Sequence, residues 1–190
     1  MTLLKALLVD LDGTLVDTRE ANFAAYQSAL AGAGVTITRQ WWTANGFGRS
    51  WRQFLPALLA DHPGVDPQAI AAAKAEIYPR FLHLSRINGG LVRLLETLRL
   101  NLKTALVTTA SRTGVDAVLD THGLRQLFDE IITGDDVAEH KPSPEAFVEA
   151  ARRLRVSASE CLVIEDSRMG IDAGLAFGAP VLAVSEGGAQ

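Results

Sequence analysis

The sequence predicts an α/β protein with a doubly wound parallel sheet, into which an all-helical segment is inserted. Three observations predict this fold class. Short, unbroken apolar runs recur along the chain, which is typical of strands buried on both faces. Segments with helical periodicity separate these runs, as in parallel βαβ units. One long stretch, residues 17–88, carries helical patterns and no convincing strand.

The predicted strands are the apolar runs themselves. The first run, residues 6–9, is closed by Asp10. The later runs share its length and character and cover residues 104–107, 161–164 and 180–184, with a shorter candidate at residues 131–132. Because the runs alternate with helical segments, we expect these strands to lie in one parallel sheet.

The core helices are predicted from periodicity and from signals at their ends. Gly123 is the expected C-terminal stop of the helix before it. Ser143 followed by Pro144 indicates a helix start, because a capping residue then precedes a proline in the first turn. The apolar residues that share one face in these helices are Leu91, Leu94, Leu95 and Leu98, then Val115, Val118 and Leu119, then Phe147, Ala150, Ala151 and Leu154.

We expect residues 1–16 and 89–190 to form the core domain and residues 17–88 to form a helical cap. Asp17 with Glu20 resembles a capping pair at the first helix start of the cap. Further helix starts are indicated by Ser50, which precedes an apolar stripe, and by Asp66 with Pro67, while Pro79 is expected to kink or end the last helix. A helical insertion after the first strand is best interpreted as a lid.

Length and composition are those of an ordinary globular chain. It has 190 residues, of which 48% are hydrophobic and 21% charged, with a net charge of −4. This charge does not favour nucleic acid, whose binding proteins usually show a basic patch. The N-terminus has no secretory pattern, and no run reaches the roughly 18 apolar residues of a membrane span. We therefore expect a cytoplasmic monomer without nucleic-acid or membrane partners.

The single cysteine, Cys161, cannot form an intramolecular disulfide, which fits a reducing compartment. It opens an apolar run, so we expect a buried structural residue and not a nucleophile.

Polar side chains follow the predicted strands where each strand ends. In open parallel sheets, ligands bind outside the carboxyl ends of the strands. The residues at these ends are Asp10 and Asp12 after the first strand, Thr108 after the run 104–107, Glu165 and Asp166 after the run 161–164, and Lys141 just before Ser143. Carboxylates this close repel one another unless a cation lies among them, and magnesium suits oxygen ligands together with a phosphate. These residue types predict phosphoryl chemistry, whereas no Ser/His/acid or Cys/His set is placed for acyl transfer.

The same residues resemble the four motifs of the haloacid dehalogenase superfamily, in the family's order and spacing. Residues 10–15 resemble the first motif, and Thr108 the second. Lys141 resembles the third, and residues 164–167 the fourth. The resemblance covers nearly the whole chain and implies a Rossmann-like core.

This resemblance implies a mechanism through an aspartyl-phosphate with Mg²⁺ as cofactor. Asp10 would attack phosphorus. Asp12 would protonate the leaving oxygen and then act as a base toward water. Thr108 and Lys141 would hold phosphate oxygens.

The resemblance also implies a set of metal ligands. They are Asp10, the main-chain oxygen of Asp12, and Asp166. Glu165 would be a further ligand, or it would contact the ligands without binding the metal itself.

The helical insertion lies where the superfamily's C1 cap belongs, which indicates subfamily I and the β-phosphoglucomutase and phosphoglycolate phosphatase group. Arg49 and Lys74 lie near positions where β-phosphoglucomutase-like proteins contact substrate, so we expect both to bind substrate. That subgroup often has a histidine where this sequence has Asn22. In the mutases this histidine is linked to cap closure, so its absence favours a hydrolase that acts on a small phosphorylated metabolite.

Two alternatives stay open. One is a β-phosphoglucomutase-like sugar phosphomutase. The other is a receiver-like signalling module, which also forms an aspartyl-phosphate on a parallel sheet, but with its acidic pair and acceptor in the opposite order. The superfamily's dehalogenases attack carbon and lack the aspartate that stands here at Asp12. The substrate could be a sugar phosphate, phosphoglycolate or a nucleotide-like monophosphate.

Overall fold

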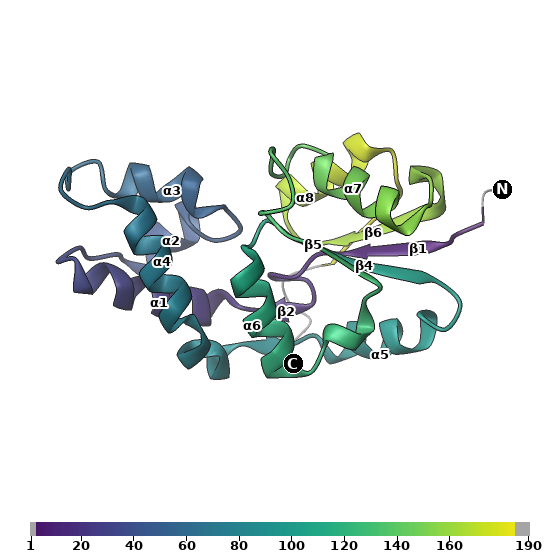
Figure 1. Ribbon diagram of the computed structural model, residues 1–190, viewed down its shortest axis with the longest axis horizontal. Coiled ribbons are helices and arrows are strands. Elements are labelled where there is room, and N and C mark those ends of the chain that lie inside the picture. The colour runs from purple at the N-terminus through teal and green to yellow at the C-terminus, as the bar shows by residue number, and fades with distance from the viewer. Residues whose placement is uncertain (1–2, 185–190) are drawn as a thin grey trace. The chain divides into compact units, whose positions relative to one another are not determined.

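The computed structural model describes residues 3–184, and the chain divides into two compact units. The first unit is Met1–Asp17 with Arg86–Gln190, and the second is Thr18–Ser85. The first division thus falls after Asp17 where we expected it after residue 16, and the second after Ser85 where we expected residue 88. The first unit is α/β and the second is helical (Figure 1).

The α/β unit contains a five-stranded parallel sheet with the strand order β5-β4-β1-β6-β7. Its strands are β1 (Ala6–Val9), β4 (Lys103–Val107), β5 (Glu130–Ile132), β6 (Cys161–Glu165) and β7 (Val181–Ala183). This confirms the predicted α/β fold class with a parallel sheet. In the register, Val9 lies opposite Leu106 on one side and Ile164 on the other. The carboxyl ends of the three central strands are therefore level with one another.

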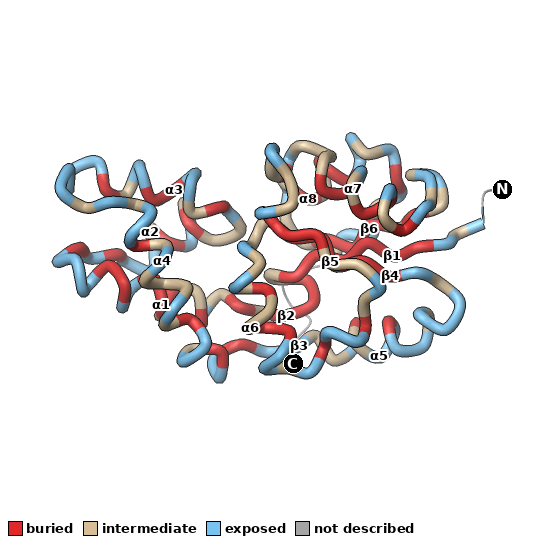
Figure 2. The backbone as a smooth tube through the Cα atoms, viewed as in Figure 1, coloured by how far each residue is buried: buried red, intermediate tan, exposed pale blue. Residues whose placement is uncertain are grey.

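Helices cover both faces of this sheet (Figure 1). Helices α7 (Glu145–Leu154) and α8 (Arg168–Phe177) lie on one face, and α5 (Gly89–Leu98) and α6 (Arg112–His122) on the other. Alternate residues of a strand point to opposite faces. Ala6 and Leu8 accordingly belong to the core cluster that includes residues of α7 and α8. Figure 2 shows the central strands in the colour of buried residues, as expected for a sheet covered on both faces.

Shorter elements complete this unit. A two-stranded antiparallel sheet is formed by β2 (Val16–Asp17) and β3 (Arg86–Ile87). Two 3₁₀ turns, η2 (Arg125–Leu127) and η3 (Ala158–Glu160), precede β5 and β6.

The ends of the core helices largely follow the sequence signals. Gly123 ends α6 in the left-handed conformation, with φ of 63°, as predicted. The start of α7 was predicted one residue too early. Pro144 is the N-cap, and the helix begins at Glu145, whose N–H donates to the Ser143 hydroxyl over 3.3 Å. Ser143 thus satisfies an N-terminal N–H from just outside the helix.

The second unit contains four α-helices and one 3₁₀ helix within its described residues. They are α1 (Arg19–Gly32), α2 (Arg39–Asn45), α3 (Trp51–Leu58), α4 (Pro67–Ile77) and η1 (Tyr78–Leu84). Ser50 begins α3 through a capping box with Gln53. The Asp66 carboxylate accepts the N–H groups of Gln68 and Ala69 at the start of α4. These starts confirm the capping interpretation.

Two further signals in this unit had different outcomes. The predicted capping pair of Asp17 with Glu20 was wrong, because Thr18 is the N-cap of α1 and Asp17 lies in β2. The prediction for Pro79 is confirmed, since α4 ends at Ile77 and the chain continues as a 3₁₀ helix. Proline lacks the N–H that the next α-helical turn requires.

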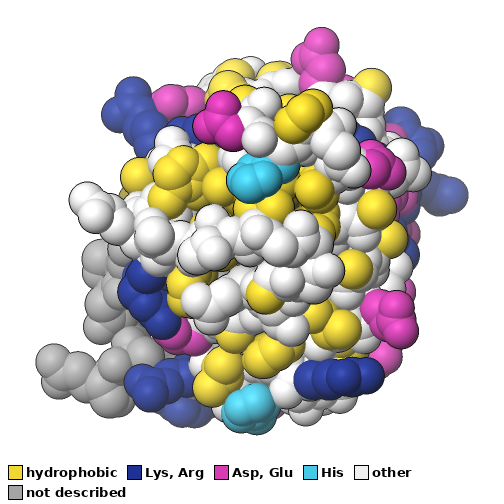
Figure 3. Space-filling view, turned by 90° about the vertical axis from the view of Figure 1, so that its left-hand side faces the viewer, with side chains coloured by type: hydrophobic (Ala, Val, Ile, Leu, Met, Phe, Trp, Pro, Cys, Tyr) yellow, Lys and Arg dark blue, Asp and Glu magenta, His cyan; other side chains and the backbone are white. Residues whose placement is uncertain are grey.

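Aromatic rings form the centre of the helical unit. The ring of Trp42 lies 5.2 Å from Tyr26 and 5.5 Å from Phe54, between ring centroids. Partly buried Trp41 and Trp51 pack against this core. Figure 3 shows that apolar side chains also reach the surface on the face turned to the viewer, while charged side chains lie mainly around its edge.

Among the described residues, no helix is both long enough and apolar enough to cross a membrane.

Cys161 is fully buried at the start of β6, where its thiol lies 3.3 Å from the Ser157 carbonyl oxygen. Burial, with a smaller contribution from Glu160, raises the pKa of the Cys161 thiol to about 11. The reactive thiolate is therefore scarce at neutral pH.

We expect the folded protein to resist modification by a disulfide-based thiol reagent at pH 7, because Cys161 is both inaccessible and protonated. Absorbance of the released chromophore measures the reaction. The same protein in denaturant should react rapidly with one thiol per chain. Rapid, complete reaction of the folded protein would show that the thiol is exposed.

Candidate active site

The carboxyl ends of β1 and β6 bring two acidic side chains together. Asp10 follows β1 directly, and its N–H donates to the Ile164 carbonyl of β6 over 3.0 Å. Glu165 is the last residue of β6. Both side chains are buried, with exposed fractions of 7% for Asp10 and 1% for Glu165. The continuous hydrogen bonding of the sheet thus fixes two carboxylates side by side in a dry environment.

The ammonium group of Lys141 lies between these two carboxylates. Its Nζ is 2.6 Å from Asp10 Oδ1 and 2.6 Å from Glu165 Oε1, and it donates to the Val107 carbonyl over 2.9 Å. These three acceptors match the three protons of the group. Lys141 is 3% exposed. The loop before α7 therefore delivers a fully bonded cation to the ends of β1, β4 and β6.

Glu165 is held on its other oxygen as well. Its Oε2 accepts the N–H groups of Asp166 and Ser167 and the Ser167 hydroxyl, each over 3.0 Å. The same hydroxyl accepts the N–H of Gly170 as the N-cap of α8. Glu165 is therefore an anchor that joins the start of α8 to Lys141.

Asp166 and Asp12 lie at the edge of this buried cluster. The Thr14 hydroxyl donates to Asp166 Oδ1 over 2.7 Å, and Thr14 itself is 1% exposed. Asp12 lies three residues beyond the end of β1, is half-buried, and forms an isolated bridge with Val16. The turn that contains Asp12 thus also supplies the hydroxyl that fixes Asp166.

Thr108 follows β4 at the same level of the sheet. Its N–H donates to the Ile132 carbonyl over 3.0 Å, and its hydroxyl accepts the N–H of Ala110 over 3.1 Å. It is 2% exposed. Thr108 is thus the residue that directly follows the strand.

The ionisation of the cluster follows from its burial. Burial, followed by repulsion from Glu165, raises the pKa of Asp10 well above its usual value, although Lys141 opposes the shift. Burial alone would lower the pKa of Lys141, but the ion pairs with Asp10 and Glu165 raise it. The ion pairs thus favour the charged form of Lys141, and a further positive charge beside Asp10 would favour its ionised form.

Three carboxylates of this cluster lie close enough to share one cation. Oxygen atoms of Asp10, Glu165 and Asp166 all lie within 4.8 Å of one another. With Lys141, three negative groups and one positive group meet at one edge of the sheet. Such an arrangement favours a bound divalent cation with oxygen ligands.

The residues predicted to bind substrate, Arg49 and Lys74, belong to the helical unit. Arg49 is exposed, and its N–H donates to the Gly46 carbonyl. Lys74 Nζ lies 3.5 Å from the centroid of the Tyr78 ring. Asn22, at the position of the missing histidine, donates to the Tyr78 hydroxyl over 3.3 Å. The contacts given for these three residues all lie inside the helical unit.

Sequence reasoning missed two supporting residues, Thr14 and Ser167. Both lie inside the motifs that were recognised: Ser167 directly follows Asp166, and Thr14 lies two residues after Asp12. Ser167 bonds locally to Glu165 and Gly170, so a helix-capping signal could have found it, whereas Thr14 bonds to a distant part of the chain. Thr14 and Asp166 are 152 positions apart in the chain.

Residues 4–178 match the haloacid dehalogenase-like hydrolase family. The fructose-1-phosphate phosphatase YqaB of Escherichia coli (strain K12) is 30% identical over 172 residues, which cover 90% of this chain and 92% of the relative. The phosphoglycolate phosphatase 1 of Pseudomonas aeruginosa is 31% identical over 192 residues, covering 96% of this chain and 70% of the relative.

Solved structures of the same kind share the fold. The crystal structure of CbbY from Rhodobacter sphaeroides in complex with phosphate has a TM-score of 0.89 and 27% identity, covering 96% of this chain and 87% of that one. The β-phosphoglucomutase of Clostridium difficile has a TM-score of 0.82 and 25% identity, covering 96% of this chain and 85% of that one. Together with the family match, these likenesses show that the chain belongs to the haloacid dehalogenase-like hydrolase family, as its four motifs predicted.

Proposed function

We propose that this haloacid dehalogenase-like phosphohydrolase cleaves the phosphate ester of a small phosphorylated sugar, with Asp10 as nucleophile and Mg²⁺ as cofactor. One observation carries the proposal. Asp10 lies buried at the end of β1, within reach of two further carboxylates and in direct contact with Lys141. A nucleophilic carboxylate and a fixed cation are the groups that phosphoryl transfer requires.

The donor set fits Mg²⁺. Its three carboxylates offer hard oxygen ligands within 4.8 Å of one another. Glu165 already accepts hydrogen bonds on both oxygens, so Asp10, Asp166 and the main-chain oxygen of Asp12 are the better ligands. When bound, the ion would supply charge that keeps Asp10 ionised and draws electron density from the phosphoryl group.

The proposed reaction has two displacements. In the first, an Asp10 oxygen forms a bond to phosphorus while the bond to the sugar oxygen breaks, and Asp12 gives its proton to that oxygen. In the second, Asp12 takes a proton from water, the water oxygen bonds to phosphorus, and the bond to Asp10 breaks. Thr108 and Lys141 stabilise the negative charge on the phosphoryl oxygens in both steps.

The relatives support a sugar phosphate as the substrate class. YqaB is named as a fructose-1-phosphate phosphatase, and CbbY has been solved with phosphate. We assign substrate selection to the helical unit as a cap, with Arg49 and Lys74 as the residues that contact the sugar phosphate. Arg49 is exposed and so accessible to a ligand.

The alternatives are not favoured. The match of residues 4–178 to the haloacid dehalogenase-like hydrolase family argues against a receiver-like module. A mutase has structural support in the β-phosphoglucomutase of C. difficile, but the sequence relatives named above are phosphatases. Asn22 in place of the cap histidine also favours hydrolysis. A cytoplasmic location and a monomeric state remain predictions from the sequence.

Asp10→Asn should reduce phosphate release from a panel of sugar phosphates to near background, because an amide is a poor nucleophile. Wild-type release should require Mg²⁺ and stop with a chelator. Inorganic phosphate is measured in both cases.

Asp172→Asn is the matched control, since this carboxylate forms an exposed pair with Arg168 and should leave activity unchanged. If Asp10→Asn retains more than a few per cent of activity, the nucleophile assignment is wrong.

Asp12→Asn should lower kcat/KM, which reports the first displacement, by about 10² to 10⁴, the usual contribution of general acid–base catalysis. A substrate with a phenolate leaving group, which needs less protonation, should lose less than an alkyl phosphate. Steady-state kinetics with both substrates measure this difference. Equal losses with the two leaving groups would assign the proton transfer to another residue.

Gly13 lies against the proposed metal ligands and depends on having no side chain. Its φ is +96°, and a Cβ there would overlap the Asp166 carboxylate. Gly34, with φ of +74°, has no atom within 4 Å of the corresponding position. The two glycines share the backbone requirement but differ in their surroundings.

Gly13→Ala and Gly34→Ala should each lower the free energy of unfolding by about 1–2 kcal/mol, the cost of the left-handed region. Only Gly13→Ala should displace Asp166 and weaken Mg²⁺ binding, by about 10- to 100-fold. The rise in Tm with Mg²⁺ concentration measures this affinity. An unchanged Mg²⁺ response in Gly13→Ala would remove Asp166 from the ligand set.

A further inference from the structure

The segment between β5 and α7, residues 133–144, contains an aspartate with partners on both oxygens. Asp136 Oδ2 accepts the N–H of Thr133 over 2.8 Å, its hydroxyl over 2.6 Å and the Arg112 guanidinium over 2.6 Å. Asp136 Oδ1 accepts the Arg153 guanidinium over 3.0 Å. The carboxylate thus has four donors from three separate parts of the chain.

These donors connect elements that carry proposed phosphate-binding residues. Arg112 is the first residue of α6 and follows the turn that begins with Thr108. The same guanidinium nitrogen also donates to the Ile131 carbonyl of β5 over 3.0 Å. Arg153 belongs to α7. Asp136 therefore ties its own segment to the start of α6 and to α7.

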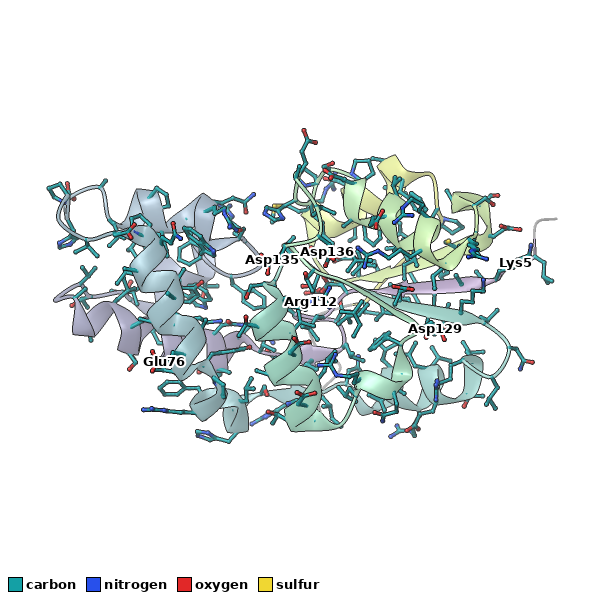
Figure 4. All side chains as sticks on the ribbon, viewed as in Figure 1. Lys5, Glu76, Arg112, Asp129, Asp135 and Asp136 are labelled. Carbon is teal, nitrogen blue, oxygen red and sulfur yellow. The ribbon has the colours of Figure 1, made fainter. Side chains whose placement is uncertain are left out.

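Other contacts hold the same two segments together. The N–H of Gly134 donates to the Ala110 carbonyl over 2.8 Å, and a Cβ at Gly134 would overlap the Thr109 carbonyl oxygen. The N–H of Arg112 donates to Asp135 Oδ2 over 2.8 Å. Figure 4 shows Arg112, Asp135 and Asp136 close together at this edge of the sheet.

The remainder of the segment is fixed on its way to Lys141. The carboxylate of Glu145, at the start of α7, accepts the N–H of Ala138 over 2.9 Å and that of Glu139 over 2.8 Å. Only a few residues separate these bonds from Asp136 on one side and Lys141 on the other. Because these hydrogen bonds fix the segment between the two residues, we expect a displacement of Asp136 to displace Lys141 as well.

We infer that Asp136, clasped by Arg112 and Arg153, is a positioning residue that sets Thr108 and Lys141 relative to each other. The inference rests on the proposed function, in which these two residues hold the phosphoryl group. Asp136 itself is not among the three described carboxylates that gather for a metal ion. Although its burial opposes the shift, the Thr133 hydrogen bonds and the arginines lower the pKa of Asp136 to about 2. The carboxylate therefore stays charged at any pH at which an assay would be run.

Loss of this clasp should affect kcat more than KM. Thr108 and Lys141 act on charge that develops during phosphoryl transfer, so their placement matters most in the transition state. A misplacement of about 1 Å can cost about 10²-fold in rate.

Asp136→Asn is the primary variant, because it keeps the shape but removes the charge and turns one acceptor into a donor. We expect kcat for a sugar phosphate to fall by at least about tenfold while KM changes by less than about threefold. Arg112→Gln, at a more exposed side chain, should cause a smaller loss of the same kind and serves if Asp136→Asn does not fold. The double variant should be no worse than Asp136→Asn, because both changes break one network.

Asp129→Asn is the matched control. Asp129 precedes the same strand β5, lies at the opposite end of the sheet (Figure 4), and accepts the N–H of Thr104 over 2.8 Å. It should lower the free energy of unfolding in urea yet leave kcat within about twofold of wild type.

Hydrogen–deuterium exchange supplies a readout that does not depend on activity. Asp136→Asn should speed exchange in residues 108–112 and 133–144, and Asp129→Asn should not. An absence of phosphate release from the wild type would count against the proposed function, and exchange would still decide the positioning role. Unchanged exchange and kcat in Asp136→Asn, or equal kcat losses in Asp136→Asn and Asp129→Asn, would overturn the inference.

Discussion

The buried ammonium group of Lys141 is the constraint on which the rest of the site depends. Removing a charge from water is costly unless partners replace the lost solvation. Lys141 meets this requirement with Asp10, Glu165 and the Val107 carbonyl, so all three protons are bound. Each partner comes from the end of a different strand, β1, β6 or β4. The three central strands must therefore end at the same level, and the loop before α7 must reach across them.

The same ion pairs explain why the site attracts a cation. Two carboxylates are engaged by Lys141, and Asp166 adds a third within the same small volume. One ammonium cannot balance three negative groups, and burial, followed by repulsion from Glu165, raises the pKa of Asp10. The supporting contacts follow from that imbalance as well. The second oxygen of Glu165 accepts hydrogen bonds from the residues at the start of α8, and the Thr14 hydroxyl fixes Asp166. The pairing of Asp136 with Arg112 holds the segment that leads to Lys141.

The two units carry different kinds of candidate residues. The α/β unit carries the four motifs and the contacts just described, while the family match over residues 4–178 covers both units. The helical unit has its own aromatic core around Trp42, and its polar candidates vary in character. Lys74 is engaged with the Tyr78 ring, whereas Arg49 is exposed. In the proposed function these two side chains contact the sugar phosphate, while the residues of the α/β unit carry out the phosphoryl transfer.

The sequence by itself determined the fold class, the strands of the parallel sheet and the candidate site residues at their ends, but not the short antiparallel pair of β2 and β3. Each of these features is encoded by a short stretch of sequence, either an apolar run closed by a polar residue or a helix with its own start signal. Asp66 with Pro67 and Gly123 were predicted correctly for that reason. Asp17 was not, because it pairs with Arg86 in the sheet of β2 and β3, and Ser143 was not, because the helix begins one residue later, after Pro144. Only the tertiary structure decided that Lys141 is shared between Asp10 and Glu165, that Thr14 binds Asp166, and that Asp136 is clasped by two arginines. These contacts join residues far apart in the chain, and no local pattern encodes which of many acids and bases will meet once the sheet has formed.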